Sequence, residues 1–299
     1  MSEDEVTIIG AGPAGIAAAI YLQRAKLEPV LIERHESGGL LRSANWVENY
    51  PGFPEGICGL DLVAKFKDQM KQLGIRPMLG EVLSVRRMRR GFELRLGSSR
   101  RTSRALIVAT GTRPAKIGIK GAAGLQGKLV FSELPDLPQA LKSRRVIVVG
   151  GGDAAFDYSM NLLARGARPI IVSRSEPSGL ELLRERTEAL GVELVIGATP
   201  KKVGRSRQGV IMTCMAGSTE LEIEGDMMLA ACGRVPNIEV LGPTLRGAAG
   251  PGPSGLPETK VKGLYLAGDI VRSKQRQTGI AVGDGIRAAM LAEQYLRGR

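Results

Sequence analysis

The sequence predicts an α/β protein in which one structural unit occurs twice: a strand, a glycine-rich turn, a helix and a second strand. The first copy runs from Val6 to Glu33 and the second from Arg145 to Ser173. The strands are β-branched runs of the kind found in parallel strands that are buried on both faces. With 299 residues, 43% of them hydrophobic, the chain is long enough for two domains with separate cores.

The first glycine-rich turn has the G-x-G-x-x-G spacing of a dinucleotide-binding fingerprint, with Gly10, Gly12 and Gly15. In such a turn the first glycine makes the bend, the second lets a pyrophosphate approach the backbone, and the third lets helix and strand pack closely. Glu33 ends the next strand, where an acidic side chain accepts hydrogen bonds from ribose hydroxyls. We therefore expect this turn, including Pro13 and Ala14, to bind a dinucleotide at the helix N-terminus.

The second turn contains Gly150, Gly151, Gly152, Asp153 and Ala154 and matches the G-x-G-x-x-A variant of the fingerprint. Two dinucleotide sites in one chain favour hydride transfer between a nicotinamide and a flavin. The strand after this turn ends with Ser173 and Arg174 instead of an acidic residue. A cation at this place suits the 2′-phosphate of NADP, whereas an acid suits NAD. NADPH is therefore favoured over NADH, although Arg174 could equally be an ordinary surface arginine.

The rest of the chain continues the alternation of strands, helices and turns. We expect helices at 60–73, 180–190 and 279–295, buried strands at 104–110 and 226–231, a strand at 193–196, and a strand and turn at 263–269. Strand pairs are expected at 82–96 and 210–223, and a loop at 242–257.

Cysteine and histidine usage excludes several kinds of site. Cys58, Cys214 and Cys232 are far apart in the sequence, so a disulfide framework or a zinc site is not expected. His35 is the single histidine, which argues against a histidine metal centre and against a Ser-His-Asp triad. The acidic N-terminus lacks the basic region of a signal peptide, and the uncharged stretch 6–23 is explained by a strand, a turn and a helix. We expect no metal, no membrane association and a cytoplasmic location.

The net charge of +12 is unevenly distributed. Residues 117–241 hold 15 basic and 14 acidic residues, whereas the rest of the chain holds 27 and 16. Eight arginines lie between Arg86 and Arg104, with Glu93 as the one acidic residue among them. This stretch is either a solvated face of a small sheet or a docking surface for an acidic partner. Nucleic acid is not expected as the partner, because stacking aromatics do not accompany the arginines.

Nearly from end to end, the chain resembles the low-molecular-weight thioredoxin reductase family. The motifs that carry the resemblance are 10–15, Glu33, 38–39, 47–52, 109–111, 150–153, 236–237, 267–269 and 276–278. The resemblance implies two Rossmann-like, three-layer ββα domains, with an NAD(P) domain at 116–243 inserted into a discontinuous FAD domain at 1–115 and 244–299. It also implies a homodimer and a rotation of the domains about hinge segments at 112–114 and 241–243.

The resemblance further implies which residues contact the cofactors. Asp269 would lie on the FAD ribitol, Arg276, Gln277 and Thr278 at the flavin end, and Asn49 against FAD. The remaining FAD residues expected from the family pattern are Arg34, Gly39, Leu40, Val82, Thr110, Gly111 and Gly268. The NAD(P) residues are those of the second fingerprint, Gly150 to Ala154, together with Ser173 and Arg174.

The sequence departs from the family at its redox-active dithiol. Family members carry a Cys-x-x-Cys pair just before the second fingerprint, but residues 130–138 contain no cysteine. Ser175 interrupts the arginine-rich NADP motif, and Leu40 stands where the family usually has a glutamine. We therefore expect chemistry on the flavin, without a catalytic protein residue and without the usual reduction of thioredoxin.

Three functions remain compatible with the sequence. The first is electron transfer between NAD(P)H and an acidic protein carrier such as ferredoxin or flavodoxin. The second is flavin-mediated reduction of a small molecule or of a partner's disulfide. The third is a non-catalytic redox sensor that binds both nucleotides.

Overall fold

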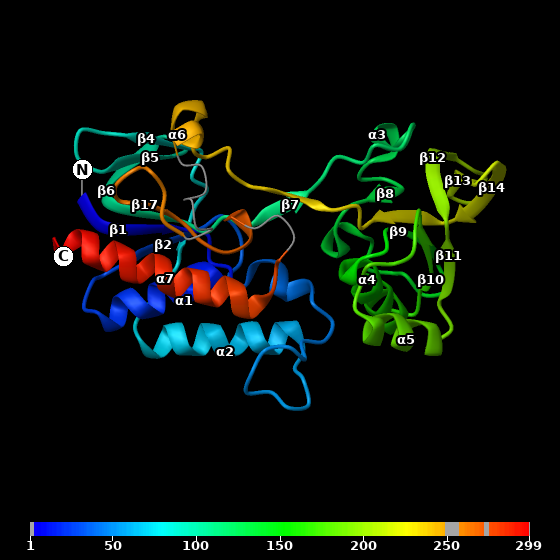
Figure 1. The fold of residues 1–299 in the computed structure, drawn as a ribbon, viewed down its shortest axis with the longest axis horizontal. Helices are drawn as coiled ribbons and strands as arrows, with labels where there is room; N and C mark the ends of the chain where they lie inside the picture. The colour runs from blue at the N-terminus through cyan, green and yellow to red at the C-terminus, as the bar shows by residue number, and fades with distance from the viewer. Residues whose placement is uncertain (1–2, 249–256, 272–274, 299) are drawn as a thin grey trace. The chain divides into compact units, whose positions relative to one another are not determined.

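The computed structural model describes residues 3–248, 257–271 and 275–298, and it divides into two compact units (Figure 1). The first unit comprises Met1–Arg113 and Val235–Arg299, and the second comprises Pro114–Arg234. An inserted unit is thus present, but its second boundary lies nine residues before the predicted one at 243/244. The reason is packing: Val240 accepts a backbone hydrogen bond from Val85, and Leu241 is buried in the core of the first unit.

The first unit is built on a mixed sheet. Its elements are β1 (Glu3–Ile9), α1 (Pro13–Arg24), β2 (Val30–Glu33), the 3₁₀ helix η1 (Gly39–Ser43), α2 (Gly59–Gln72), β3 (Met78–Leu79), β4 (Ser84–Arg87), β5 (Phe92–Leu96), β6 (Ser99–Val108), α6 (Pro243–Ala248), β17 (Leu264–Leu266), the 3₁₀ helix η3 (Gly268–Val271) and α7 (Thr278–Leu296).

Strand β6 belongs to two layers of this unit. It pairs in parallel with β1 along one side, while on the other side its amino half pairs antiparallel with β5 and residues 106–108 pair in parallel with β17. Val6, Ile8 and Ile107 pack against α1 and α7, whereas Leu106 and Val108 pack against the β4–β5 hairpin. Because neighbouring residues of a strand point to opposite faces, the successive apolar residues of β6 contribute to both hydrophobic clusters of this unit.

The second unit repeats this plan. Its elements are α3 (Ala122–Leu125), β8 (Val130–Phe131), the 3₁₀ helix η2 (Leu134–Asp136), β9 (Arg145–Val149), α4 (Asp153–Ala164), β10 (Arg168–Ser173), α5 (Glu181–Ala189), β11 (Glu193–Ile196), β12 (Ala198–Arg205), β13 (Val210–Ala216), β14 (Thr219–Gly225) and β15 (Met227–Ala230).

A parallel sheet in the order β11-β10-β9-β15-β8 forms the middle layer of the second unit. Val146 and Val148 of β9 pack on the helical side with Phe156, while Ile147 and Val149 pack on the other side against an antiparallel sheet of β12, β13 and β14. Each unit is therefore a three-layer ββα domain, which confirms the predicted fold class.

Two short strands connect the units. β7 (Thr112–Pro114) pairs with β16 (Arg234–Pro236), as the crossing ribbons in Figure 1 show. The expected hinge at 112–114 coincides with β7, but the return connection is 234–236 and not 241–243. Leu241 and Gly242 instead precede the short helix α6, and Pro243 is its first residue.

Three other expectations were wrong in detail. The loop predicted at 242–257 contains α6, and its residues 249–256 lie outside the described part of the chain. The predicted hairpin at 210–223 has a third strand, β12, whose Pro200, Lys201 and Lys202 obscure the alternation of a strand. Val82 precedes β4 instead of belonging to it. Of the helices in the described ranges, none is both long and apolar enough to cross a lipid bilayer.

Candidate nucleotide-binding sites

Residues predicted to bind FAD gather at one edge of the first sheet. Gly10 follows the end of β1, Arg34 follows β2, Val82 comes shortly after β3, Thr110 follows β6 and Gly268 follows β17. The carboxyl ends of parallel strands meet at one edge of a sheet, which is where ligands bind in folds of this class. The structure therefore brings together residues that are more than 250 positions apart in the sequence.

The three fingerprint glycines of this edge have different surroundings. A Cβ on Gly10 would lie 2.4 Å from the Ala109 carbonyl oxygen, and one on Gly15 would lie 1.8 Å from the Gly10 carbonyl oxygen. A Cβ on Gly12 would meet no atom closer than the Gly39 Cα, at 4.0 Å. The first and third glycines are thus required by packing, while the second leaves open space at the N-terminus of α1. This is the arrangement that a pyrophosphate needs.

Glu33 is held directly against the fingerprint turn. Its Oε2 accepts a hydrogen bond of 2.7 Å from the Ala11 N–H, and its Oε1 accepts one of 3.0 Å from the His35 N–H. A carboxylate has further lone pairs that can accept from ribose hydroxyls. Glu33, the residue predicted to bind the ribose, is therefore held in position by two backbone N–H groups. The neighbouring Arg34 is exposed.

A side-chain hydrogen bond joins two predicted flavin-end residues from distant segments. The Asn49 Nδ2 donates to the Gln277 Oε1 at 2.7 Å, which ties the loop before α2 to the start of α7. Thr278 is the first residue of α7, and Asp269 and Arg276 also make polar interactions. Leu40, the residue that departs from the family pattern, is 39% exposed.

Thr110 makes two hydrogen bonds with the returning chain. Its hydroxyl donates to the Asn237 carbonyl at 2.6 Å, and the Asn237 amide donates back to the Thr110 carbonyl at 3.0 Å. The hydroxyl therefore fixes the returning chain, while Gly111, at φ +62°, has no atom within 4 Å of where a Cβ would lie. Asn237 was not among the predicted site residues, although the Pro236-Asn237 motif was the available signal.

Helix α7 packs tightly behind the first fingerprint. A Cβ on Gly285 would lie 2.0 Å from the Ala14 carbonyl oxygen, and one on Gly268 would lie 2.9 Å from the Ala14 Cβ. Asp284, next to this contact, is only 4% exposed and makes polar interactions. Sequence reasoning missed Asp284 because an acidic residue in an amphipathic helix is ordinarily assigned to the solvent face.

The second fingerprint has the same division of roles. A Cβ on Gly150 would lie 2.5 Å from the Ala231 carbonyl oxygen, whereas one on Gly152 would have no atom within 4 Å. Ala155 takes the place of the third glycine and is fully buried. The open space at Gly152 lies at the N-terminus of α4, as it does for Gly12 and α1.

Three other residues predicted to bind NAD(P) have distinct positions. Ser173 is buried, and its hydroxyl donates to the Ser175 carbonyl at 2.7 Å. Asp153 accepts a 2.8 Å hydrogen bond from the Leu180 N–H at the start of α5. Ser173 and Asp153 thus shape the loop beside the nucleotide edge, whereas Arg174 is exposed at the end of β10.

The three cysteines are free of disulfide bonds. Cys214 is buried in β13, and burial raises its pKa. Cys232 follows β15 and is exposed. Burial of the thiol group raises the pKa of Cys232, an effect that the nearby Arg174 partly offsets, and the thiol donates to the Val149 carbonyl at 3.4 Å.

An ion pair occupies the segment where the family has its dithiol. Glu133, just after β8, accepts a 2.6 Å hydrogen bond from the guanidinium of Arg234, the first residue of β16. Nearby, burial and the charge of Glu133 raise the pKa of Asp136. These contacts involve no sulfur, and a carboxylate cannot take up an electron pair as a disulfide does.

Acidic side chains neutralise part of the positive charge of the arginine-rich stretch 86–104. Four of its eight arginines form ion pairs: Arg86 and Arg100 with Glu93, Arg101 with Asp4, and Arg104 with Glu5. The Asp4 pair is bidentate, at 2.9 and 2.7 Å. The two acids of β1 were overlooked because they are about 100 positions away in the sequence. Arg101 therefore has a structural role as the partner of Asp4.

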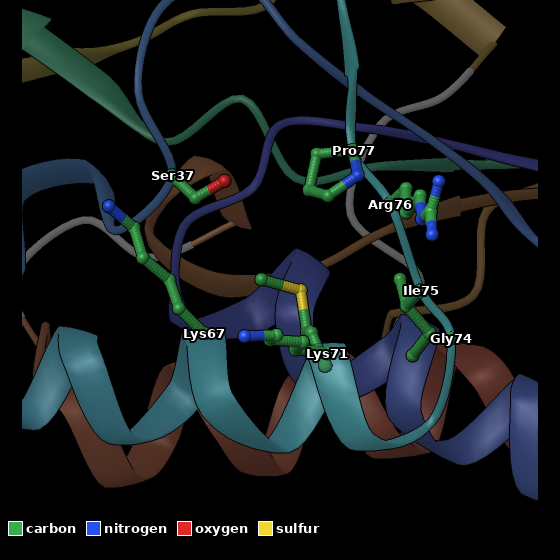
Figure 2. Close-up of a pocket in the computed structure, with 8 residues that line it drawn as sticks. Ser37, Lys67, Lys71, Gly74, Ile75, Arg76 and Pro77 are labelled. Atoms are coloured by element: carbon green, nitrogen blue, oxygen red, sulfur yellow. The ribbon is translucent and has the colours of Figure 1, made fainter.

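A pocket of about 340 Å³ lies elsewhere in the first unit, between α2 and the chain that leads to β3. Figure 2 shows Lys67 and Lys71 extending from α2 below, with Ser37 and Pro77 above. None of the eight lining residues belongs to the predicted FAD set. Lys67 forms an ion pair with Glu36 at 2.7 Å, and hydrogen bonds from Arg42 and Lys67 lower the pKa of Glu36 to about 2.

Comparisons with known proteins identify the family of the chain. The model of the pyridine nucleotide-disulphide oxidoreductase family matches residues 4–285. Thioredoxin reductase of Bacillus subtilis (strain 168) is 32% identical over 99% of this chain and 96% of its own. The structure of Lactococcus lactis thioredoxin reductase has a TM-score of 0.87 at 24% identity, covering 99% of this chain and all of its own.

A second kind of enzyme shares the fold. Bacillithiol disulfide reductase Bdr of Staphylococcus aureus has a TM-score of 0.78 at 19% identity, covering 98% of this chain and all of its own. At that identity the likeness concerns the fold alone. Together with the family match over almost the whole chain, these findings confirm the resemblance found in the sequence. The chain belongs to the pyridine nucleotide-disulphide oxidoreductase family, as an FAD- and NAD(P)H-dependent oxidoreductase with the thioredoxin reductase fold.

Proposed function

We propose that this enzyme passes electrons between NAD(P)H and an acidic protein carrier, such as a ferredoxin or flavodoxin, by way of FAD and without a protein dithiol. The observation that supports this proposal is the Glu133–Arg234 ion pair in the segment where the family carries its two cysteines. FAD, when bound, can accept a hydride and release the electrons one at a time, so a carrier can be served without thiol chemistry.

The protein's own residues divide the remaining tasks. The open turns at Gly12 and Gly152 each leave room for a pyrophosphate, and Glu33 can accept from the ribose of one nucleotide. Arg174 is placed at the end of β10, where a cation suits a 2′-phosphate. No described cysteine pair is needed for any of these contacts.

An anaerobic titration with NADPH, and separately with NADH, tests the donor side of the proposal. We expect NADPH to bleach the flavin absorbance stoichiometrically and at lower concentration than NADH. The Arg174→Met variant should lose this preference for NADPH. A flavin that neither nucleotide reduces would overturn NAD(P)H as donor and would favour the redox-sensor hypothesis. If Arg174→Met loses flavin reduction equally with both nucleotides, Arg174 does not recognise the 2′-phosphate.

The acceptor side is tested with reduced enzyme and carriers of known charge. One NADPH supplies two electrons, so it should reduce two equivalents of a one-electron carrier. Between 50 and 300 mM salt the rate with an acidic carrier should fall steeply, because exposed charges are screened. Arg87→Glu with Arg90→Glu should slow this reaction, while the reaction with a neutral quinone stays unchanged. Salt-independent carrier kinetics would remove the electrostatic docking from the proposal.

Reduction of a low-molecular-weight disulfide is the second candidate. The fold likeness to bacillithiol disulfide reductase Bdr supports considering it. In that case one NADPH would yield two thiols from one disulfide, and a panel of small disulfides would be consumed without a carrier. Turnover of a disulfide at a rate exceeding that with every carrier would replace the first proposal with this one.

Removing the two cysteines that lie outside the buried core tests the claim that no cysteine takes part. Replacing Cys58 and Cys232 with serine leaves only Cys214, which is buried in β13. We expect the double variant to retain both flavin reduction by NADPH and electron transfer to the acceptor. Loss of acceptor reduction with normal flavin reduction would mean that a thiol relays the electrons.

A further inference from the structure

In the parallel sheet of the second unit, the order in which strands are added reverses at β9. From β9 the chain goes to β10 and β11 on one side, whereas β15 and β8 lie on the other side. Dinucleotides lie across the carboxyl edge of such a sheet at this switch point, with one half over each side. Arg174, suited to the adenosine 2′-phosphate, follows β10. The nicotinamide half therefore belongs over the ends of β15 and β8.

The Glu133–Arg234 ion pair stands at the ends of these two strands. Glu133 comes two residues after β8, and Arg234 comes four residues after β15. Their side chains are 31% and 17% exposed, which is less than the 61% and 43% of Glu193 and Arg145 in the same unit. The pair is thus partly enclosed yet reachable from the nucleotide edge.

A third side chain holds the pair in place. Tyr158 of α4 interacts with Arg234 and lies among buried residues of the helical side, where burial raises its pKa. Arg234 thereby joins the ends of two strands to the helix that begins at the fingerprint. Its guanidinium has five donors in a fixed plane, so it can hold the Glu133 carboxylate in one orientation.

The chemistry of the pair complements the nicotinamide carboxamide. A carboxamide carries two N–H donors and one acceptor oxygen, and a carboxylate offers about four acceptor positions. We propose that Glu133, oriented by Arg234, accepts a hydrogen bond from the carboxamide N–H of bound NAD(P) and so fixes the nicotinamide ring. Glu133 is then the contact residue and Arg234 a positioning residue.

This inference rests on NAD(P)H as the electron donor of the proposed function. It adds a role for the segment that replaces the dithiol: the segment orients the donor and carries no electrons. A carboxylate at this position would also favour the oxidised, positively charged nicotinamide over the neutral reduced ring, because opposite charges attract more strongly where solvent is partly excluded.

Binding of two ligands to the purified flavoprotein tests the assignment by calorimetry. NADP⁺ and 2′-phospho-ADP-ribose differ only by the nicotinamide. Glu133→Leu should weaken NADP⁺ binding by about tenfold, the effect of one hydrogen bond to a charged group, and should leave 2′-phospho-ADP-ribose binding unchanged. Glu193→Leu, which breaks an ion pair at the amino end of β11, should change neither affinity.

Conservative variants separate contact from positioning. Glu133→Gln retains an acceptor oxygen and should keep most of the NADP⁺ affinity, whereas Glu133→Asp withdraws the carboxylate and should lose several-fold. The Asp variant also provides the test if Glu133→Leu does not fold. Arg234→Met should reproduce the selective loss, and Arg234→Lys should restore part of it.

The outcomes distinguish this inference from the proposed function. Equal losses for both ligands, or no loss for NADP⁺, in the Glu133 variants would overturn the carboxamide contact while flavin reduction by NADPH still stands. A wild-type protein that binds neither ligand would overturn both.

Discussion

Substitution by alanine should impair cofactor binding at Gly12 and the stability of the fold at Gly15. A Cβ on Gly12 meets open space, with the nearest atom at 4.0 Å, whereas a Cβ on Gly15 would lie 1.8 Å from a backbone oxygen. Gly12→Ala should therefore damage cofactor binding and spare the fold. Gly15→Ala should damage the fold even when no cofactor is bound.

The magnitudes follow from these distances. Gly12 caps α1 with an extended backbone, and a Gly-to-Ala change at a helix N-cap has a small effect, so the apoprotein should lose less than about 1 kcal/mol. The new methyl group occupies the space of the pyrophosphate and displaces a charge-assisted hydrogen bond worth about 1.5–3 kcal/mol. This corresponds to roughly 10- to 150-fold weaker FAD binding.

For Gly15→Ala the opposing term is helix propensity, which favours alanine by about 1 kcal/mol. A clash with a backbone oxygen cannot be relieved by a rotamer change, so α1 must move away from β1. Overpacking of a core costs about 1–3 kcal/mol, and contact with rigid backbone lies at the upper end of that range. We expect a net loss of about 2 kcal/mol, or a lowering of the melting temperature by about 4–8 °C.

Both variants are assayed as apoproteins by thermal unfolding and then titrated with FAD by fluorescence quenching. The expected pattern is a normal melting temperature with weak binding for Gly12→Ala, and a lowered melting temperature for Gly15→Ala. Similar melting temperatures for the two variants would refute the assignment of one glycine to packing and the other to the ligand.

Two other predictions concern charged groups of the first unit. Arg101→Met should destabilise the protein by about 2 kcal/mol in denaturant unfolding, since it leaves the 93% buried Asp4 carboxylate without its bidentate partner; a loss no larger than that of an exposed-arginine control such as Arg89→Met would contradict this. The pKa of Glu36 is lowered to about 2 by hydrogen bonds from Arg42 and Lys67, so its ionised form stabilises the folded state above pH 4.5, and that contribution is lost as the pH falls through about 2. The unfolding free energies of wild type and Glu36→Gln should therefore differ most near neutral pH and converge as the pH falls below about 2, and a gap that widens in acid would show the opposite sign of linkage.

Much of the fold could be predicted because its signals are local. The fingerprint turns, the β-branched strands and the amphipathic helices each occupy one continuous stretch, so period and turn residues were sufficient. β12 was missed because Pro200 and two lysines interrupt its pattern, and β7 and β16 were missed because three residues are too few to show one.

The contacts that complete the sites could not be predicted in the same way. Arg101 and Asp4 are 97 positions apart, Arg234 and Glu133 are 101, and Thr110 and Asn237 are 127. Only the folded topology brings such residues together, because no period or turn signal connects them. The side chains of Ser173 and Asp153 make hydrogen bonds to neighbouring loops, which a motif does not reveal.

The paired connection between the units makes the second unit interchangeable. Its two ends lie side by side, with the Ala115 N–H donating to the Gly233 carbonyl at 3.0 Å. A segment whose ends meet can be cut out, replaced by another domain or closed by a short linker while the host keeps its sheet, because both host ends are also adjacent. An evolving lineage could therefore exchange the electron donor of this flavoprotein by one recombination event, and a protein engineer could do the same at 114 and 234.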